Sequence, residues 1–281
     1  MGRWSLFIFL FGLSLAPVYA QDLTARGQWF LYWGYNRAGY SWSDIHLEGP
    51  GYDVTFRHVK AHDRPSEPST EYVLPGTFTT PQYNYRLGYF LRDRWSLSLG
   101  LDHMKYVVDQ DQMVRVDGTV APDRSDAYAM DHDSRMVTLG PDLLKYEHTD
   151  GLNLLCVDVD HYDALWRAAN GRHGLHVFEG LHAGALIPRS DVRIFGEGVN
   201  NVFHLAGFGV GAQAGLHLVL WKHLLVRTTG RAGWVELPDV LTTGEAGERA
   251  SQHFWFWQAN LTVGAQFALG GRKADHPSAA P

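Results

Sequence analysis

The sequence predicts an all-β fold, a membrane-spanning antiparallel up-and-down β-barrel of eight strands. From Trp29 onward, stretches of about ten residues alternate between apolar side chains and small or polar ones, which is the period of a strand with two different faces. Short and long connections alternate between these stretches, as in barrels that cross a membrane. The polar face carries mostly glycine, amide and hydroxyl groups, whereas a face in bulk water would carry many Lys and Glu residues.

The N-terminal segment has the pattern of an export signal. Arg3 supplies a positive charge, residues 6–15 are apolar, and Ala20 offers a small residue for cleavage. No later segment reaches the roughly 18 to 20 apolar residues that a membrane-spanning helix needs. We therefore expect a signal peptide at 1–20, a barrel at 21–269 and a flexible C-terminal tail at 270–281.

The last strand shows the alternation most clearly. Within 253–269, Trp255 and Trp257 fall on one face and Gln258 on the other, and 203–219 repeats the pattern with glycines on its polar face. Counting between the connections predicts strands at 27–41, 82–91, 95–108, 152–166, 173–187, 202–220, 224–236 and 253–269. Because this number is even, both ends of the barrel return to the same side of the membrane.

The connections distinguish the two ends of the predicted barrel. Those at 91–94, 168–172 and 221–223 are short, whereas those at 42–80, 109–150, 188–201 and 237–252 are long. Prolines in 65–81 and aspartates with little periodicity in 109–133 indicate exposed loops. Ten strands are the alternative, because 52–62 and 71–78 could form one further pair. Pro75 counts against that pair, since proline cannot donate a ladder hydrogen bond.

The composition supports this fold and excludes some functions. The chain has 30 glycines, 10 tryptophans and 13 tyrosines, and its aromatic residues gather near predicted strand ends, where they suit the headgroup level of a bilayer. Cys156 is the only cysteine, so no intrachain disulfide can form. A net charge of -6 without a basic stripe argues against nucleic acid as a partner.

Three stretches carry a resemblance to a known group. The segments 85–90, 101–106 and 146–153 are similar to ones found in an uncharacterised family of bacterial outer-membrane β-barrel proteins. The resemblance implies a location in the bacterial outer membrane, with long loops outside and short turns in the periplasm. It also implies contact with outer-membrane lipid and lipopolysaccharide, and insertion by the barrel-assembly machinery.

Six charged residues are predicted to face the lumen of the barrel. They are Arg86, Asp102, Asp158, Asp160, Arg227 and Arg231. An eight-stranded barrel is only wide enough inside to be filled by side chains, and an isolated buried ion costs several kcal/mol. We therefore expect a salt-bridge network that plugs the lumen. The alternative is a small-solute channel, which would require ten or more strands.

A second cluster concentrates an imidazole and two carboxylates at the predicted external rim. Glu147, His148 and Asp150 precede a predicted strand, and His103 lies across the hairpin. A histidine held by a carboxylate is the minimum for general-base catalysis or nucleophile activation in acyl transfer, although no Gly-x-Ser-x-Gly elbow accompanies it. These residues make a membrane-embedded lipid hydrolase or acyltransferase the second hypothesis.

The leading hypothesis is a non-enzymatic barrel, because the strand rhythm is complete and a catalytic signature is missing. Its external loops would contact the environment, an extracellular ligand or lipopolysaccharide. The 15 histidines show no spacing typical of zinc sites, so we expect no metal site and no cofactor. Glu179 interrupts the apolar face of its strand. Either a β-bulge near Gly180 turns it inward, which is the explanation we favour, or it lies close to the periplasmic headgroups.

Overall fold

The architecture is a closed ring of eight antiparallel strands. The computed structural model describes residues 23–67, 69–70, 81–198 and 202–269. In these residues the ring runs through β1 (Gln28–Tyr40), β5 (Tyr83–Arg92), β6 (Trp95–Val108), β9 (Leu144–Arg167), β10 (Gly174–Leu186), β12 (Gly207–Leu220), β13 (Leu224–Leu241) and β14 (Arg249–Ala268). Pairing of β1 with β14 closes it, so the prediction of an eight-stranded barrel is confirmed.

The alternative of ten strands is wrong for the part of the chain that the structure describes. The segment 52–62 forms β3 (Tyr52–Val59) and β4 (Ala61–His62), and neither belongs to the ring. The other segment of that pair, 71–78, lies outside the described residues, as do the expected signal peptide at 1–20 and the expected tail at 270–281.

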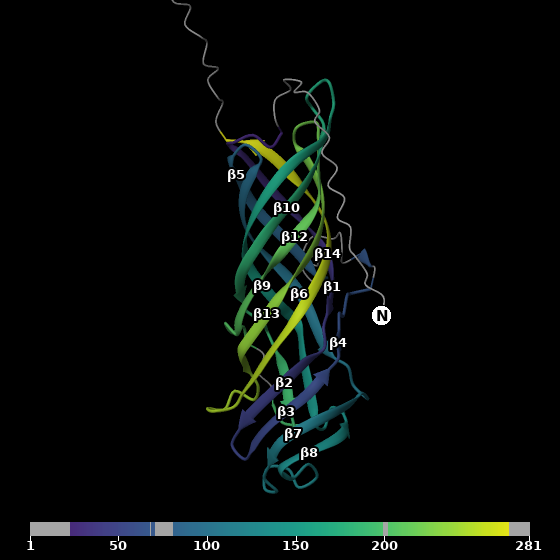
Figure 1. Ribbon diagram of the computed structural model, residues 1–281, viewed down its shortest axis with the longest axis vertical. Coiled ribbons are helices and arrows are strands. Elements are labelled where there is room, and N and C mark those ends of the chain that lie inside the picture. Colours follow the sequence, from purple (N-terminus) through teal and green to yellow (C-terminus); the bar gives the residue numbers. More distant parts are fainter. Residues whose placement is uncertain (1–22, 68, 71–80, 199–201, 270–281) are drawn as a thin grey trace, which may run out of the picture.

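The sheet of the barrel continues beyond the ring at the end that carries the long connections (Figure 1). In it β2 (Ser43–Gly49) pairs with the start of β14 and with β3, and β3 pairs with β7 (Met113–Val120), which pairs with β8 (Met130–Thr138). We call β2, β3, β7 and β8 the distal sheet. The prediction that 109–133 is an exposed loop is therefore wrong. Alternation does occur in β7, where Val114 and Val116 are buried, but it is too short to stand out among the aspartates.

The remaining connections are also partly ordered. The long connection after β10 contains β11 (Asp191–Ile194), which pairs with the start of β9, and β13 and β14 continue far into the connection between them. Short turns join the strands at the opposite end, which we call the proximal end. No helix in the described residues is long and apolar enough to cross a membrane.

Apolar side chains face outward around the ring. The large exposed ones come from seven of the eight ring strands, all except β13, and include Leu31, Leu87, Leu97, Leu99, Val157, Val159, Leu181, Phe208, Val210, Leu216, Leu261 and Val263. Tryptophans stand near both ends of this band, Trp95, Trp166 and Trp221 at the proximal end and Trp255 and Trp257 toward the distal sheet. Such a band with aromatic margins matches the hydrocarbon layer of a bilayer and its two interfaces.

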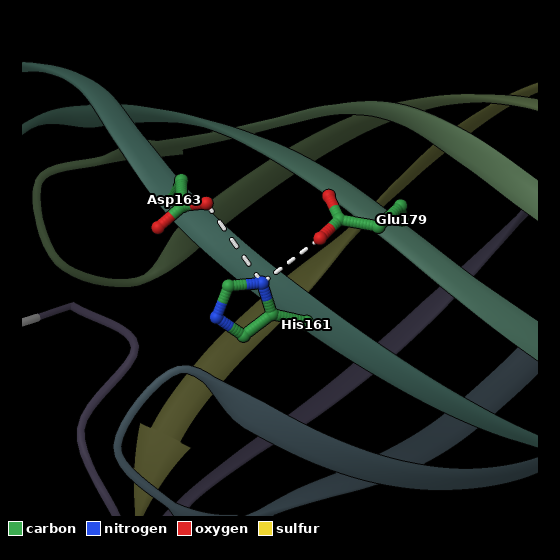
Figure 2. A group of neighbouring side chains, drawn as sticks. All are labelled: His161, Asp163 and Glu179. Atoms are coloured by element: carbon green, nitrogen blue, oxygen red, sulfur yellow. Dashed lines mark hydrogen bonds and ion pairs between the residues drawn. The ribbon is translucent and has the colours of Figure 1, made fainter. Parts of the chain in front are cut away.

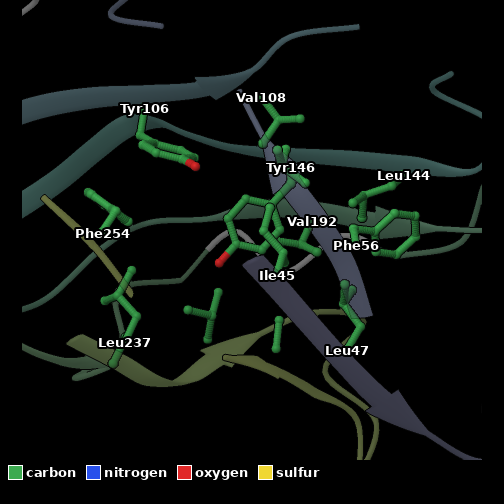
Figure 3. Packing of buried hydrophobic residues seen from close by; sticks show 14 of the residues in the cluster. Ile45, Leu47, Phe56, Tyr106, Val108, Leu144, Tyr146, Val192, Leu237 and Phe254 are labelled. Atoms are coloured by element: carbon green, nitrogen blue, oxygen red, sulfur yellow. The ribbon is translucent and has the colours of Figure 1, made fainter. Parts of the chain in front are cut away.

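Two hydrophobic clusters fill the interior at opposite ends. The proximal cluster consists of Leu23, Phe30, Tyr32, Phe90, Tyr162, Phe178, Val219 and Leu225. Gly88 is required there, because a Cβ on it would lie 2.0 Å from the ring of Phe30. The larger distal cluster joins the distal sheet to the barrel, with Ile45, Phe56 and Tyr146 among its members (Figure 3). Both ends of the lumen are therefore occupied by apolar side chains.

Replacement of Leu99 by Arg tests whether the outward band meets hydrocarbon. Leu99 lies on β6, four residues from Trp95 at the proximal margin, and is 55% exposed. An arginine at the bilayer midplane of a barrel costs about 2–4 kcal/mol, whereas an exposed change in water costs roughly 0.5 kcal/mol or less. We expect Leu99→Arg to lower the free energy of unfolding from lipid vesicles by the larger amount. The control is Met113→Arg in the distal sheet, where the side chain is 66% exposed, and equal losses in both variants would contradict the band.

Candidate functional site

The structure brings all six predicted lumen charges into the middle of the barrel. Arg86 on β5 donates from Nη1 and Nη2 to the two carboxylate oxygens of Asp102, at 3.0 and 2.9 Å. Its Nε donates to Asp158 Oδ2 at 2.6 Å. Both aspartates lie on the strands that follow β5 in the ring, Asp102 on β6 and Asp158 on β9. One guanidinium therefore binds two carboxylates from neighbouring strands, in the forked geometry that makes such pairs strong.

Arg231 completes this group from the opposite wall. It lies on β13, which the ring separates from β6 and β9. Its Nη2 donates to Asp158 Oδ1 at 3.0 Å, and its Nη1 donates to Asp102 Oδ2. Two arginines and two aspartates thus alternate across the lumen, and each carboxylate is shared by both guanidinium groups.

A second pair lies on the proximal side of this group. Arg227 donates from Nη2 to Asp160 Oδ2 and from Nη1 to the hydroxyl of Tyr162, both at 2.7 Å. Its guanidinium carbon stands 3.4 Å from the ring centroid of Phe178, a cation–π contact. Gln213 donates to the other oxygen of Asp160 at 2.6 Å. The proximal cluster and the charged layer are therefore joined through one arginine.

These six side chains have no contact with bulk solvent. Each is 0–1% exposed, and the three arginines balance the three aspartates in formal charge. Buried charges are tolerated only when they are paired and hydrogen-bonded, and every one of these has a partner of opposite sign. The network can close the lumen and hold the strands in position. None of its six charged groups is accessible to a solute.

The four residues proposed for catalysis are not assembled into one site. His103 hydrogen-bonds Asn153 at 2.9 Å and stacks on Tyr83. Glu147 forms an ion pair with Lys145 at 2.9 Å, and Asp150 lies 3.7 Å from Arg189. The strand starts at Leu144 and not after Asp150 as the sequence suggested. Alternation turns Glu147 and His148 to opposite faces, and an irregularity between His148 and Leu152, where Gly151 has a φ of 125°, interrupts the alternation at Asp150. Successive side chains on a strand point to opposite faces.

His148 has a different partner, which the sequence did not indicate. Its Nδ1 lies 2.8 Å from Ser190 Oγ, just before β11. The imidazole is fully buried between Tyr106 and Tyr146 in the distal cluster, and Nε2 has no hydrogen-bond partner among the residues that the structure describes. The two residues are 42 positions apart in the sequence, and the pairing of β11 with β9 brings them together. A histidine and serine pair is present, but it is covered by the distal sheet and its neighbours.

A third polar group faces outward at the proximal end. His161 Nδ1 lies 2.9 Å from Glu179 Oε1 and 3.8 Å from Asp163 Oδ2 (Figure 2). These three could offer ligand atoms within 4.8 Å of one another. The spacing of histidines in the sequence did not predict this group, because its residues come from two different strands. Arg94 also binds Asp163, at 2.8 Å. Both carboxylates thus have protein partners, and we interpret the group as an interfacial ion-pair cluster.

The same group corrects the expectation for Glu179. No bulge occurs at Gly180; the irregularity of β10 lies between Leu175 and His176. Glu179 keeps its outward direction and pairs with His161. His161 pairs with Trp95, the first residue of β6 and one of the tryptophans at the proximal margin of the band, and their ring centroids lie 4.8 Å apart, so the carboxylate does not need to turn inward. A charge near the interface costs much less than one at the midplane.

Comparison with known proteins adds little beyond the fold. No protein-family model matches the chain. No curated protein matches it either. It is similar to the outer membrane protein OprG from Pseudomonas aeruginosa, with 10% identity and a TM-score of 0.42 over 89% of this chain and 100% of that chain.

It is also similar to Ail, the attachment invasion locus protein of Yersinia pestis, solved with the heparin analogue sucrose octasulfate. That match has 10% identity and a TM-score of 0.28 over 86% of this chain and 99% of that chain. Similarities of this size carry no functional argument. The closed ring and its apolar outer surface, not these superpositions, give this chain the fold of an outer-membrane β-barrel.

Replacement of Arg231 by Met tests the buried charge network. The variant leaves Asp102 and Asp158 to share the single guanidinium of Arg86, and removing one partner of a buried ion pair costs about 3–5 kcal/mol. We expect that loss in the free energy of unfolding, measured by guanidinium titration in lipid vesicles. Arg94→Met is the control, since that exposed pair contributes about 1 kcal/mol at most. An unchanged stability of Arg231→Met would show that the network is dispensable.

Proposed function

We propose that this chain is a bacterial outer-membrane β-barrel protein with a plugged lumen, which acts at the cell surface through its distal sheet. The proposal includes export by the N-terminal signal and insertion by the barrel-assembly machinery. The observation that carries it is the filling of the lumen in three successive layers. Apolar clusters occupy both ends, and the paired charges lie between them.

The outward band supports the location in a membrane. Large apolar side chains from seven of the eight ring strands are exposed together, and exposed apolar surface of such extent marks contact with hydrocarbon or a partner. The long connections and the distal sheet lie at one end and the short turns at the other, which in barrels of this type are the external and periplasmic ends. The distal sheet would then stand outside the cell.

The distal sheet supports a role in surface contact. Its inner face belongs to the distal cluster, whereas its outer face carries charged side chains in ion pairs, among them Arg57 between Asp44 and Asp117 at 2.8 Å from each. Burial raises the pKa of the Asp44 carboxyl, but hydrogen bonds from Arg57 and from the backbone N–H of His58 outweigh it and lower the pKa below its usual value. An ordered, charged surface of this kind suits contact with an extracellular ligand or with lipopolysaccharide.

The two other hypotheses have less support. A channel for small solutes needs an open lumen, and the three layers leave the middle of the barrel occupied by paired side chains. A lipid hydrolase or acyltransferase needs a histidine that meets both a nucleophile and a substrate. His148 meets Ser190, but both are at least 95% buried, and the carboxylates of Glu147 and Asp150 bind other residues.

Conductance across a planar bilayer tests the plugged lumen. We expect the purified protein, refolded in lipid vesicles and fused with the bilayer, to give no stable ohmic current, because ions cannot replace the paired groups without a large desolvation cost. A wide porin in the same bilayer checks that insertion is detected. Stable unitary steps from the protein alone would contradict the proposal and favour the channel.

A further inference from the structure

An aromatic crevice opens on the outer surface where the barrel meets the distal sheet. The strand that begins as β1 breaks at Ser41 and Trp42 and resumes as β2 along the same neighbour, β14. A cavity of about 250 Å³ lies at this break, walled by Trp42, Trp234 and Trp255 and bordered by His58 and His253. Because the strand is interrupted, Trp42 stands outside both ladders and is 60% exposed.

The rings of the crevice offer several accessible aromatic faces. Trp234 and Trp255 are register partners on β13 and β14, with ring centroids 5.3 Å apart at 70°. His253 stacks on Trp234 at 5.0 Å. Trp255 is 58% exposed. An arrangement of exposed indoles at different angles presents flat apolar surfaces to the C–H faces of a sugar ring while leaving its hydroxyls in water.

The charges on the Trp42 side of the crevice favour an anion, whereas on the β13 side the Glu236 carboxylate accepts a hydrogen bond from Trp234 Nε1 at 3.1 Å. Lys60 Nζ stands 5.1 Å from the ring centroid of Trp42, which walls the cavity. Asp44, which also lines it, is bound by Arg57 at 2.8 Å. Arg57 also binds Asp117, which Arg115 binds at 3.1 Å, so two arginines balance the two carboxylates. The lysine would repel the quaternary ammonium groups that aromatic cages otherwise accept. A phosphate beside the sugar fits both the lysine and the indoles.

A shallow groove continues from the crevice down the same two strands. Below Trp234 and Trp255 the register pairs are Ala232 with Trp257 and Gly230 with Ala259. Here small side chains from β12, β13 and β14 leave a groove of about 660 Å³ in the outward band, with the exposed Arg37 of β1 also lining it. A Cβ on Gly230 would have no atom nearer than 3.8 Å, so packing does not require the glycine. The hollow is open toward the hydrocarbon.

We propose that the crevice and the groove together bind one phosphorylated glycolipid, the lipid A part of lipopolysaccharide. Its sugar packs on the indoles of Trp42 and Trp255, its phosphate binds Lys60, and an acyl chain lies in the groove over Gly230. The order of the two parts matches an amphiphile in the outer leaflet, with the headgroup at the aromatic margin and the chain below it. This inference rests on the proposed location in the outer membrane.

Native mass spectrometry in detergent tests the site. The protein is mixed with equal amounts of diphosphorylated lipid A and phosphatidylethanolamine, and we expect it to retain lipid A preferentially. Lys60→Gln removes one charge-assisted contact and should weaken retention roughly tenfold. Gly230→Leu fills the groove, and Trp42→Ala removes a wall of the crevice; both should weaken retention as well. Trp221→Ala is the matched control, an exposed tryptophan at the proximal end that should leave binding unchanged.

Three outcomes would overturn the inference: equal retention of both lipids, no effect of Lys60→Gln, or an equal loss in Trp221→Ala, which would mark nonspecific binding to the whole band. Heat-dependent mobility on gels verifies that each variant is folded, and the exposed Lys60 change gives an answer even if a tryptophan variant fails to fold. Failure of the proposed function is seen separately, as inability to fold into phosphatidylcholine vesicles, which contain no lipid A.

Discussion

Backbone pairing between β1 and β14 is the constraint on which the rest of the structure depends. It joins segments more than two hundred positions apart, from Gln28 with Ala268 to Tyr40 with Phe256. In hydrocarbon every backbone N–H and C=O must find a partner within the protein, and a closed ring has no edge strand that lacks one. Closure also sets the size of the interior. Eight strands leave room only for side chains, so whatever points inward must pack or pair.

The polarity of the inward face changes along the barrel. On β9, Leu152 and Leu154 point inward among the distal cluster, whereas Asp158 and Asp160 point inward among the arginines. Outside, Val157 and Val159 face the band. One strand therefore serves two environments. Within the band, the outward side chains of the strand are apolar because they contact hydrocarbon. Beyond the band the outer surface contacts water, so the apolar side chains point inward, where burying them is favourable.

The break between β1 and β2 links this change to the surface. Up to Tyr40 the strand belongs to the ring, and from Ser43 it belongs to the distal sheet. Trp42 stands at the transition and faces outward with Trp234 and Trp255. The aromatic crevice is thus a consequence of joining a membrane barrel to a sheet in water. The crevice is walled by indole rings, and the groove beside it is lined mostly by small residues. An amphiphile has a polar headgroup and an apolar chain in the same order.

The period-two alternation by itself determined the eight ring strands and the six inward charges, because a strand with hydrocarbon on one side and an enclosed polar interior on the other repeats every second residue. It did not determine the distal sheet, whose strands are short and lie among aspartates, nor the start of β9 before Glu147. Tertiary structure decided which partners meet. Arg231 reaches Asp102, His148 reaches Ser190 and His161 reaches Glu179 only once the strands are aligned. Such contacts depend on register between distant segments, and register is set by the closed ring as a whole, not by local sequence.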